Sequence, residues 1–282
     1  MPYYPQSNVV EQHAFQPAQW FVALEDTIAA TEYFDGTGAY ETQQFPPLGA
    51  RRVENAFMGA GVYKNVKVHG HAEFIWVWNN SGGDLDFGTL VKRRASQTVT
   101  NLDSGSVRTA VKAATFTADK EIGGLLTVYD DAGAAGAAPE AEYAAIWKNS
   151  VATLYFQPDL TTALAANDDL VIVYPYHIVA GAAGDENANL LGVIIASGGI
   201  PDGYLGWVCC KADAVKVACI AAGTAITGEN GIIAANGGLV TTGAGGATTL
   251  NVGYLLHTLQ SDSVARYAMC RIDMNTTRAA TA

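Results

Sequence analysis

The sequence predicts an all-β protein built from β-sandwich or barrel modules, with an extended N-terminal arm and at most one short helix. Over most of the chain, short runs of β-branched and aromatic residues alternate with turns rich in Gly, Asn and Asp. Turns rather than helical segments join these runs, which argues against alternating βα units. Hydrophobic residues make up 49% of the 282 residues and charged ones 15%, so we expect other subunits to cover part of the surface.

Residues 1–60 are predicted to form an extended arm. Prolines recur in this segment, and each biases the residue before it away from the helical conformation. One short helix is predicted over residues 18–33, where Trp20, Leu24 and Ile28 would share a face. The arm is rich in aromatic residues but has no core of its own, so we expect it to lie on the following domain or on a neighbouring subunit.

Residues 61–180 are predicted to form a β-rich domain. Within residues 64–79, apolar and polar side chains alternate, which indicates either one half-buried strand or a strand pair broken near Gly70. A turn rich in Gly and Asn then leads to a strand at 85–92. Four or five further antiparallel strands are expected, over segments that include 124–131, 143–147, 151–156 and 169–174.

Residues 181–282 are predicted to form a C-terminal, barrel-like module. In residues 203–220, two β-rich runs flank a break at Ala212 and Asp213. In the second run, every other residue is Val or Cys, which predicts a hairpin with one buried face. Further strands are expected at residues 190–196, 251–259 and 264–272.

The order of these C-terminal segments resembles that of tailed-bacteriophage head proteins. The strand at 190–196 is followed by Gly-Tyr-Leu-Gly-Trp at 203–207, a Val/Lys strand, a Gly-rich excursion, Val-Gly-Tyr-Leu at 252–255 and a closing strand. This order is most similar to small capsid decoration or cement proteins, over roughly the last third of the chain and more loosely in the middle. The resemblance implies a virion structural protein on the outer surface of the phage head, assembled in the bacterial cytoplasm.

The resemblance also implies partners and binding residues. The partners are the major capsid protein and further copies of this chain, most simply as a homotrimer. The arm would staple neighbouring shell subunits through five aromatic anchors: Tyr3, Tyr4, Phe15, Trp20 and Phe21. Tyr204, Trp207 and Tyr254 would lie in the module core or at the subunit interface. No long spine helix is predicted, which argues against the major capsid protein itself.

The charge balance argues against nucleic acid as a partner, and the hydropathy pattern argues against a membrane. The net charge is -11, and binding phosphates requires clustered Lys and Arg. The dense basic run from Lys92 to Arg94 is expected to be a solvated strand end or an ion-pair site. No apolar run reaches the ~18 residues that a membrane-spanning helix needs.

Two sets of residues suggest a metal site or a disulfide. His69, His71 and Glu73 would project from one face of a strand, but the outer two lie about 13 Å apart on a straight strand, so a polar strand face is expected instead of a metal site. The four cysteines fall on predicted strands, where buried free thiols are expected and a disulfide is the alternative: Cys209, Cys210, Cys219 and Cys270.

Two other functional classes stay open at this point. A head fibre, tail component or host-receptor-binding protein would recognise a glycan or a surface protein through exposed loops of the C-terminal module. A carbohydrate-active enzyme would need a pair of acids, but any β-protein with 27 acidic residues offers such pairs. The sequence contains no nucleophile elbow, phosphate loop or His-Glu-x-x-His motif, so it predicts no enzyme, no catalytic residue, no metal and no cofactor.

Overall fold

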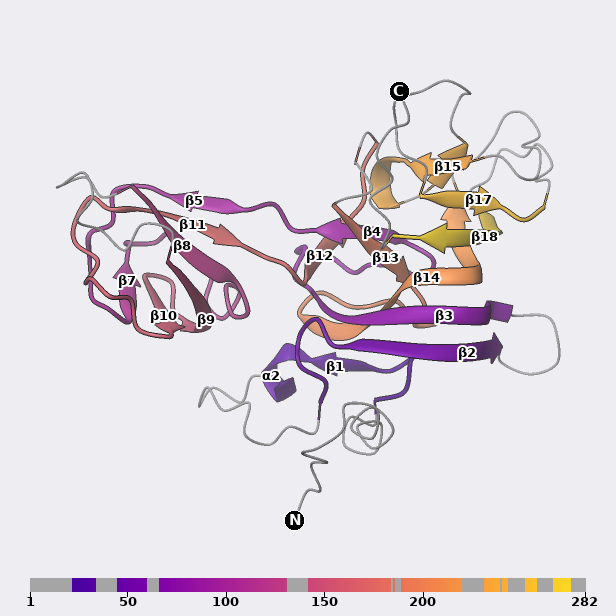
Figure 1. Cartoon of the computed structure of the whole chain (residues 1–282), viewed down its shortest axis with the longest axis horizontal. Coiled ribbons are helices and arrows are strands. Elements are labelled where there is room, and N and C mark those ends of the chain that lie inside the picture. Colours follow the sequence, from indigo (N-terminus) through magenta and orange to yellow (C-terminus); the bar gives the residue numbers. More distant parts are fainter. Residues whose placement is uncertain are drawn as a thin grey trace, which may run out of the picture. The chain divides into compact units, whose positions relative to one another are not determined.

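The computed structural model describes residues 22–33, 45–59, 66–130, 142–183, 185, 189–219, 231–238, 240–242, 252–257 and 266–274. These residues form two compact units (Figure 1). Unit one holds the described residues up to Arg93 and those from Ile178 onward, and unit two holds Arg94–His177. Helix is confined, within the described residues, to α2 (Ala30–Tyr33) and the 3-10 turn η2 (Asn236–Gly238). The predicted all-β class is confirmed.

Unit one is organised around one long strand, β14 (Tyr204–Cys219). Along one edge, β14 pairs with β3 (Val66–Asn79) from Leu205 to Val215. Both strands are continuous, so the hairpin predicted around Ala212 and Asp213 is wrong, and so is a strand pair broken near Gly70. The pairing register shifts on either side of Ala212, as expected for β-bulges.

A contact with the neighbouring strand accompanies the second of these register shifts. Asp213 Oδ2 accepts a hydrogen bond from the backbone N–H of His71 on β3, at 3.0 Å. Gly70 takes a positive φ of 86°, and a Cβ at this position would lie 2.8 Å from the Asp213 carboxylate. The neighbouring strand β3 therefore accommodates Asp213 at Gly70, and the chain continues in the same direction through Ala212 and Asp213.

The strand pairings of unit one close twice on themselves, and both closures share β14. The first ring runs from β14 through β13, β4, β12 and β3 back to β14. The second runs through β18, β17, β15 and β16, which returns to β14 as a parallel pair at Cys219 and Val240. The bounds are β4 (Leu90–Arg93), β12 (His177–Ala180), β13 (Leu190–Ile194), β15 (Gly231–Ala234), β16 (Val240–Thr242), β17 (Gly253–Leu255) and β18 (Arg266–Asp273).

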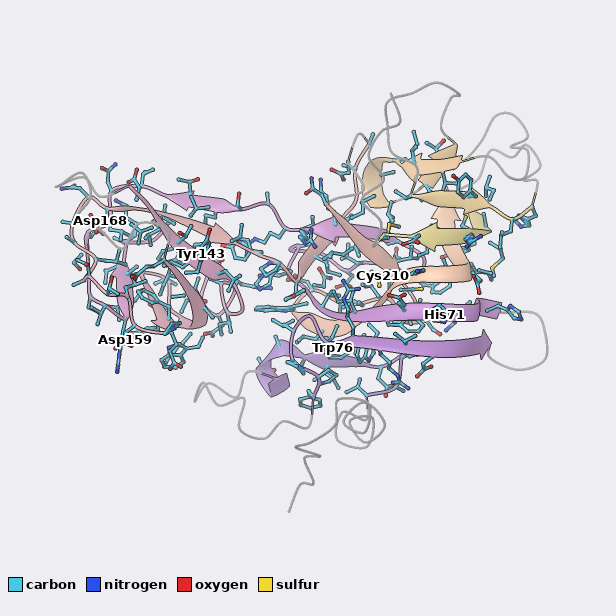
Figure 2. The ribbon with its side chains drawn as sticks, viewed as in Figure 1. His71, Trp76, Tyr143, Asp159, Asp168 and Cys210 are labelled. Carbon is cyan, nitrogen blue, oxygen red and sulfur yellow. The ribbon has the colours of Figure 1, made fainter. Side chains whose placement is uncertain are left out.

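Burial along β14 follows from this arrangement. Residues 205–210 are buried on both faces, whereas from Val215 to Cys219 buried and half-buried residues alternate. In the first part, Trp207 packs edge-to-face on Trp76 of β3 with ring centroids 5.2 Å apart. Figure 2 marks Trp76 and, further along β14, Cys210.

Unit two is a seven-stranded antiparallel sheet in the order β5-β11-β8-β9-β10-β7-β6. Its two ends are joined by residues 100–103, a link that spans at most about 17 Å, so the sheet must curl into a barrel-like shape. The curled sheet encloses an apolar core that includes Phe116, Leu126 and Phe156. The bounds are β5 (Gln97–Val99), β6 (Ser104–Gly105), β7 (Thr109–Val111), β8 (Leu125–Asp130), β9 (Tyr143–Asn149), β10 (Thr153–Gln157) and β11 (Asp169–Val173).

These units divide the chain differently from the predicted domains 1–60, 61–180 and 181–282. Unit two is an insertion, because β4 and β12 on either side of it pair with each other in unit one. Strands β3 and β14, far apart in the chain, form a long pairing and so belong to one unit. A division into consecutive segments cannot represent this topology.

Much of the predicted arm also belongs to unit one. Thr27–Ala29 forms β1, and only Ala30–Tyr33 of the predicted helix over 18–33 is helical in the described part. Arg51–Gly59 forms β2, which pairs with β3 along its whole length. The β-branched Thr27 and Ile28 pair with β14, and this pairing outweighs the local helical periodicity.

Candidate functional site: the anchor of the N-terminal segment

Residues 22–33 form an anchor that fixes the N-terminal segment to the central strand of unit one. β1 pairs antiparallel with the start of β14, placing Thr27 opposite Gly206 and Ala29 opposite Tyr204. The Ala30 N–H continues this ladder by donating to the Gly203 carbonyl at 2.8 Å. The chain preceding Val22 is thus joined to the strand on which both rings of unit one are built.

A glycine in β14 permits this close approach. A Cβ at Gly206 would lie 2.9 Å from Ile200 Cδ1 and 3.4 Å from Thr27 Cγ2. Since a contact of 2.9 Å is closer than real Cβ atoms adopt, a larger residue would displace Ile200 from the core or loosen β1.

Apolar burial reinforces the anchor. Val22 and Leu24 are both buried in unit one, although they precede β1 by several residues. The Arg52 guanidinium donates through Nη1 to the Val22 carbonyl at 3.3 Å. Burying two such side chains stabilises the segment by about 3–5 kcal/mol relative to leaving them in water.

An ion pair completes the anchor. Lys67 Nζ, on β3, donates to Glu25 Oε2 at 2.6 Å and contacts Ser197 Oγ, and the Ser197 hydroxyl donates to the same Glu25 oxygen at 2.8 Å. The Lys67 side chain is only 8% exposed, and its ammonium lies 5.5 Å from the Phe87 ring centroid. Three separate chain segments therefore meet at one charge pair.

The electrostatics favour the paired state. Burial by itself would raise the pKa of Glu25, but the hydrogen bonds from Lys67 and Ser197 and the charge of Lys67 outweigh it, so the pKa lies below its ordinary value. A lysine whose ammonium donates to a carboxylate has no lone pair with which to activate Ser197. The arrangement can hold segments together, and it does not form a nucleophile and base.

The residues predicted to bind partners lie in different places. The five arm aromatics, Tyr3, Tyr4, Phe15, Trp20 and Phe21, lie outside the described residues. Trp207 is buried in the first ring of unit one. Tyr204, beside the anchor at the start of β14, and Tyr254, on β17, are 36% and 37% exposed.

The histidine set forms part of a polar strand face. His69 and His71 are exposed on β3, and the Glu73 carboxylate lies 3.6 Å from Lys211 Nζ and 3.9 Å from His71 Nε2. Among the residues that the structure describes, no group of three His, Cys, Asp or Glu side chains is arranged to hold a metal ion. Figure 2 marks His71 on this face.

The four cysteines are buried thiols that form no disulfide. Cys209 and Cys210 lie on β14 with Cys219, and Cys270 lies on β18. Burial raises the pKa of the Cys209 thiol well above its ordinary value, and the neighbouring Cys210 adds to this effect. The expectation of buried free thiols is confirmed, and these groups are poor nucleophiles and metal ligands in this state.

Unit two contains a buried polar cluster that sequence reasoning missed. The carboxylate of Glu121 accepts from the Tyr174 hydroxyl at 2.5 Å and from Arg94 Nη1 at 3.2 Å. The Arg94 guanidinium also lies 4.1 Å from the centroid of the Tyr174 ring. The ion-pair interpretation of the basic run is confirmed at two of its residues, since Lys92 Nζ lies 2.8 Å from Asp185 Oδ1. The sequence analysis had singled out Arg94 as part of a basic run, but it had not identified Glu121 or Tyr174 as its partners.

His177 belongs to the same buried polar cluster. Its Nε2 lies 2.8 Å from the Ile122 carbonyl, and because a carbonyl only accepts, Nε2 must carry the proton. Burial lowers the pKa of His177 to about 3, assisted by the charges of Arg94 and Lys120 and opposed by the Ile122 hydrogen bond. A neutral, fully buried imidazole of this kind is a structural donor rather than a general base.

The described residues hold no helix that is long and apolar enough to cross a membrane. Comparisons with protein-family models, with curated proteins and with solved structures found no match to this chain.

Proposed function

We propose that this chain is a virion structural protein, a capsid decoration or cement protein that binds the outer surface of a tailed-phage head and stabilises it through subunit contacts. The observation that carries the proposal is the anchor. A segment with five large aromatic residues precedes Val22, and residues 22–33 are fastened to the central strand of unit one by strand pairing, apolar burial and the Glu25–Lys67 pair.

Anchoring of this kind suits a protein that works by holding neighbours together. An arm transmits load between subunits only if its base does not pull out of its own domain. Each Å² of apolar arm surface that becomes buried on a shell contributes roughly 25 cal/mol. The net charge of -11 is compatible with the outside of a head and unfavourable next to packaged DNA.

The anchor also determines how the arm should be tested. Deleting residues 1–35 would remove β1, Val22, Leu24 and Glu25 and so would destabilise unit one itself. Deleting residues 1–21 leaves the anchor complete. We expect this shorter deletion to fold, by circular dichroism and thermal melting, and to lose co-sedimentation with undecorated heads.

A matched variant separates the role of the side chains from that of chain length. In the full chain, the five arm aromatics would be replaced by Ser, and we expect the same loss of co-sedimentation. If the chain without residues 1–21 still binds heads as the full chain does, the arm is not the binding element and the proposal fails. Light scattering of the purified protein would test the proposed trimer separately.

A second candidate function, binding of a host receptor by a head fibre or tail protein, has one supporting observation. On the solvent-facing side of β17 and β18, Tyr254 and Tyr267 are exposed near the half-buried Met269. Aromatic side chains on a surface suit recognition of a glycan or protein. Loss of host adsorption, with head binding retained, on replacing Tyr254 and Tyr267 by Ser would favour this candidate.

A further inference from the structure

The sheet of unit two carries apolar side chains on both of its faces. The inward residues of its central strands, among them Leu126 and Ile146, are buried in the unit's core. The outward residues are also mostly apolar: Tyr143 is 63% exposed, Val173 39% and Leu125 37%. An antiparallel sheet with one solvated face normally alternates apolar and polar residues, so this second apolar face requires an explanation.

The strand register gathers these outward residues into one patch across β11, β8 and β9. Leu125 of β8 lies opposite Val173 on one side and Ala145 on the other. Two residues along, Thr127 lies opposite Val171 and Tyr143 in the same way. Directly opposed residues have Cβ atoms about 5 Å apart, so the side chains form a continuous surface.

The patch extends onto β10 and has little charge. The rings of Trp147 and Tyr155, on β9 and β10, lie 5.9 Å apart. Polar side chains adjoin these apolar residues: Lys148 lies opposite Tyr155, with its ammonium 5.9 Å from the ring, and Gln157 lies opposite Ala145. The described carboxylate of this face is at its end, where Asp169 Oδ1 accepts the Asn101 backbone N–H at 2.7 Å. We name the set Leu125, Thr127, Tyr143, Ala145, Trp147, Tyr155, Val171 and Val173 the outer face. Figure 2 marks Tyr143 on unit two.

We propose that the outer face is a self-association surface, which packs against the outer face of a second copy of this chain. Copies that each carry a net charge of -11 repel one another, so a surface without carboxylates is the one that opposes their close approach least. The outer face meets this condition at its centre. Two twisted sheets also pack face to face at a spacing of about 10 Å, so an apolar sheet face is complementary to itself.

The size of the outer face determines how strong this contact is. Four strands about 4.8 Å apart and five residues long cover roughly 300 Å², below the ~800 Å² per partner of a stable complex. Taken alone, this contact should therefore be weak and reversible, separate from any association within the proposed trimer. This step rests on the proposed function: on a head, neighbouring copies would be held close together. Their effective concentration would then be high enough for the same weak contact to link them.

Sedimentation velocity over a concentration series tests the proposal on the isolated protein. Tyr143→Glu places a carboxylate at the most exposed residue of the outer face, and we expect it to weaken self-association at least tenfold. Val151→Glu is the matched control, because Val151 is 57% exposed in the β9–β10 turn, away from the outer face. It should change association by less than twofold. Equal effects of the two variants, or no association of the unmodified chain at any concentration, would overturn the proposal.

Cross-linking gives a second measurement that does not depend on a disruptive change. The native thiols are buried, so a single surface cysteine reports its own surroundings. With a bismaleimide of about 10 Å reach, the spacing of packed sheets, Ala145→Cys should give cross-linked dimer. Ala163→Cys, on an exposed loop of the same unit, should give little. Equal yields would contradict the assignment.

Head binding by Tyr143→Glu separates this inference from the proposed function. If this variant self-associates normally but no longer binds heads, the outer face contacts the shell and not a second copy, and the inference is wrong. If the chain lacking residues 1–21 still binds heads, the proposed function fails while the self-association results stand.

Discussion

Replacing Glu25 by Ala should destabilise unit one more than replacing Lys67 by Met. Glu25→Ala leaves the Lys67 ammonium, 8% exposed, with Ser197 Oγ as its remaining partner. Lys67→Met removes the buried charge itself and places an apolar side chain beside the Phe87 ring. The Glu25 carboxylate that remains is 36% exposed and still accepts from Ser197, so water and one hydrogen bond satisfy it.

The magnitude follows from these two exposures. Removing one partner of a fully buried pair costs about 3–5 kcal/mol, whereas a surface pair contributes about 0–1 kcal/mol. Lys67 is buried and Glu25 is only partly so, which places the cost of Glu25→Ala at about 2 kcal/mol after allowing for screening by solvent. Lys67→Met should cost less than about 1 kcal/mol, because replacing a buried charge by an apolar group is often neutral.

Urea unfolding followed by tryptophan fluorescence provides the assay, since Trp76, Trp78 and Trp207 are buried in unit one. With an m-value of about 2 kcal/mol/M, Glu25→Ala should lower the midpoint by about 1 M. The double variant should resemble Lys67→Met alone, because the charge that Glu25 neutralises is then absent. If the two single variants cost the same and their effects simply add, the ion pair does not support the anchor.

Three further predictions concern the interior. Folding lowers the pKa of His177 from about 6.5 to about 3, so the contribution of this residue to stability is complete above pH 6.5 and falls by about 1.4 kcal/mol per pH unit below it. Unfolding curves between pH 7 and 4 should show this pH dependence of the free energy of unfolding, and the variant His177→Asn should show less of it. Gly253→Ala should cost about 2–3 kcal/mol in chemical denaturation, since its Cβ would clash with the Arg271 carbonyl oxygen; an unchanged midpoint would contradict the close pairing of β17 and β18. Burial raises the pKa of Cys209 and of Cys270, so an aromatic disulfide reagent at pH 8 should label no thiol until denaturant is added, and fast labelling of the folded protein would show that the strand rings of unit one open.

The extent of sequence-based prediction differs from element to element. The strands at 124–131, 143–147, 151–156 and 169–174 were predicted close to β8, β9, β10 and β11, because each carries its own alternation of buried and exposed residues. The break at Ala212 and Asp213 was misread as a turn. Its outcome depended on the His71 N–H of a strand about 140 residues away, which no local pattern contains.

The candidate site shows the same division. Sequence composition identified an aromatic N-terminal segment, yet the helix predicted over 18–33 concealed the anchor, because Glu25, Lys67 and Ser197 are close only after three segments have packed together. The outer face of unit two was equally hidden. Its residues read as ordinary strand residues until the register placed Leu125, Tyr143 and Val173 on one surface.

The sequence by itself determined the all-β class, the positions of many strands, the burial of the thiols and the acidic, weakly charged character of the chain. These properties depend on side-chain periodicity and composition, which are local. The tertiary structure alone decided that β14 is a single strand shared by two closed rings, that residues 94–177 are an insertion, and that residues 22–33 anchor the N-terminal segment. These depend on pairings between distant segments, and a strand's alternation shows which face is buried but not which partner buries it.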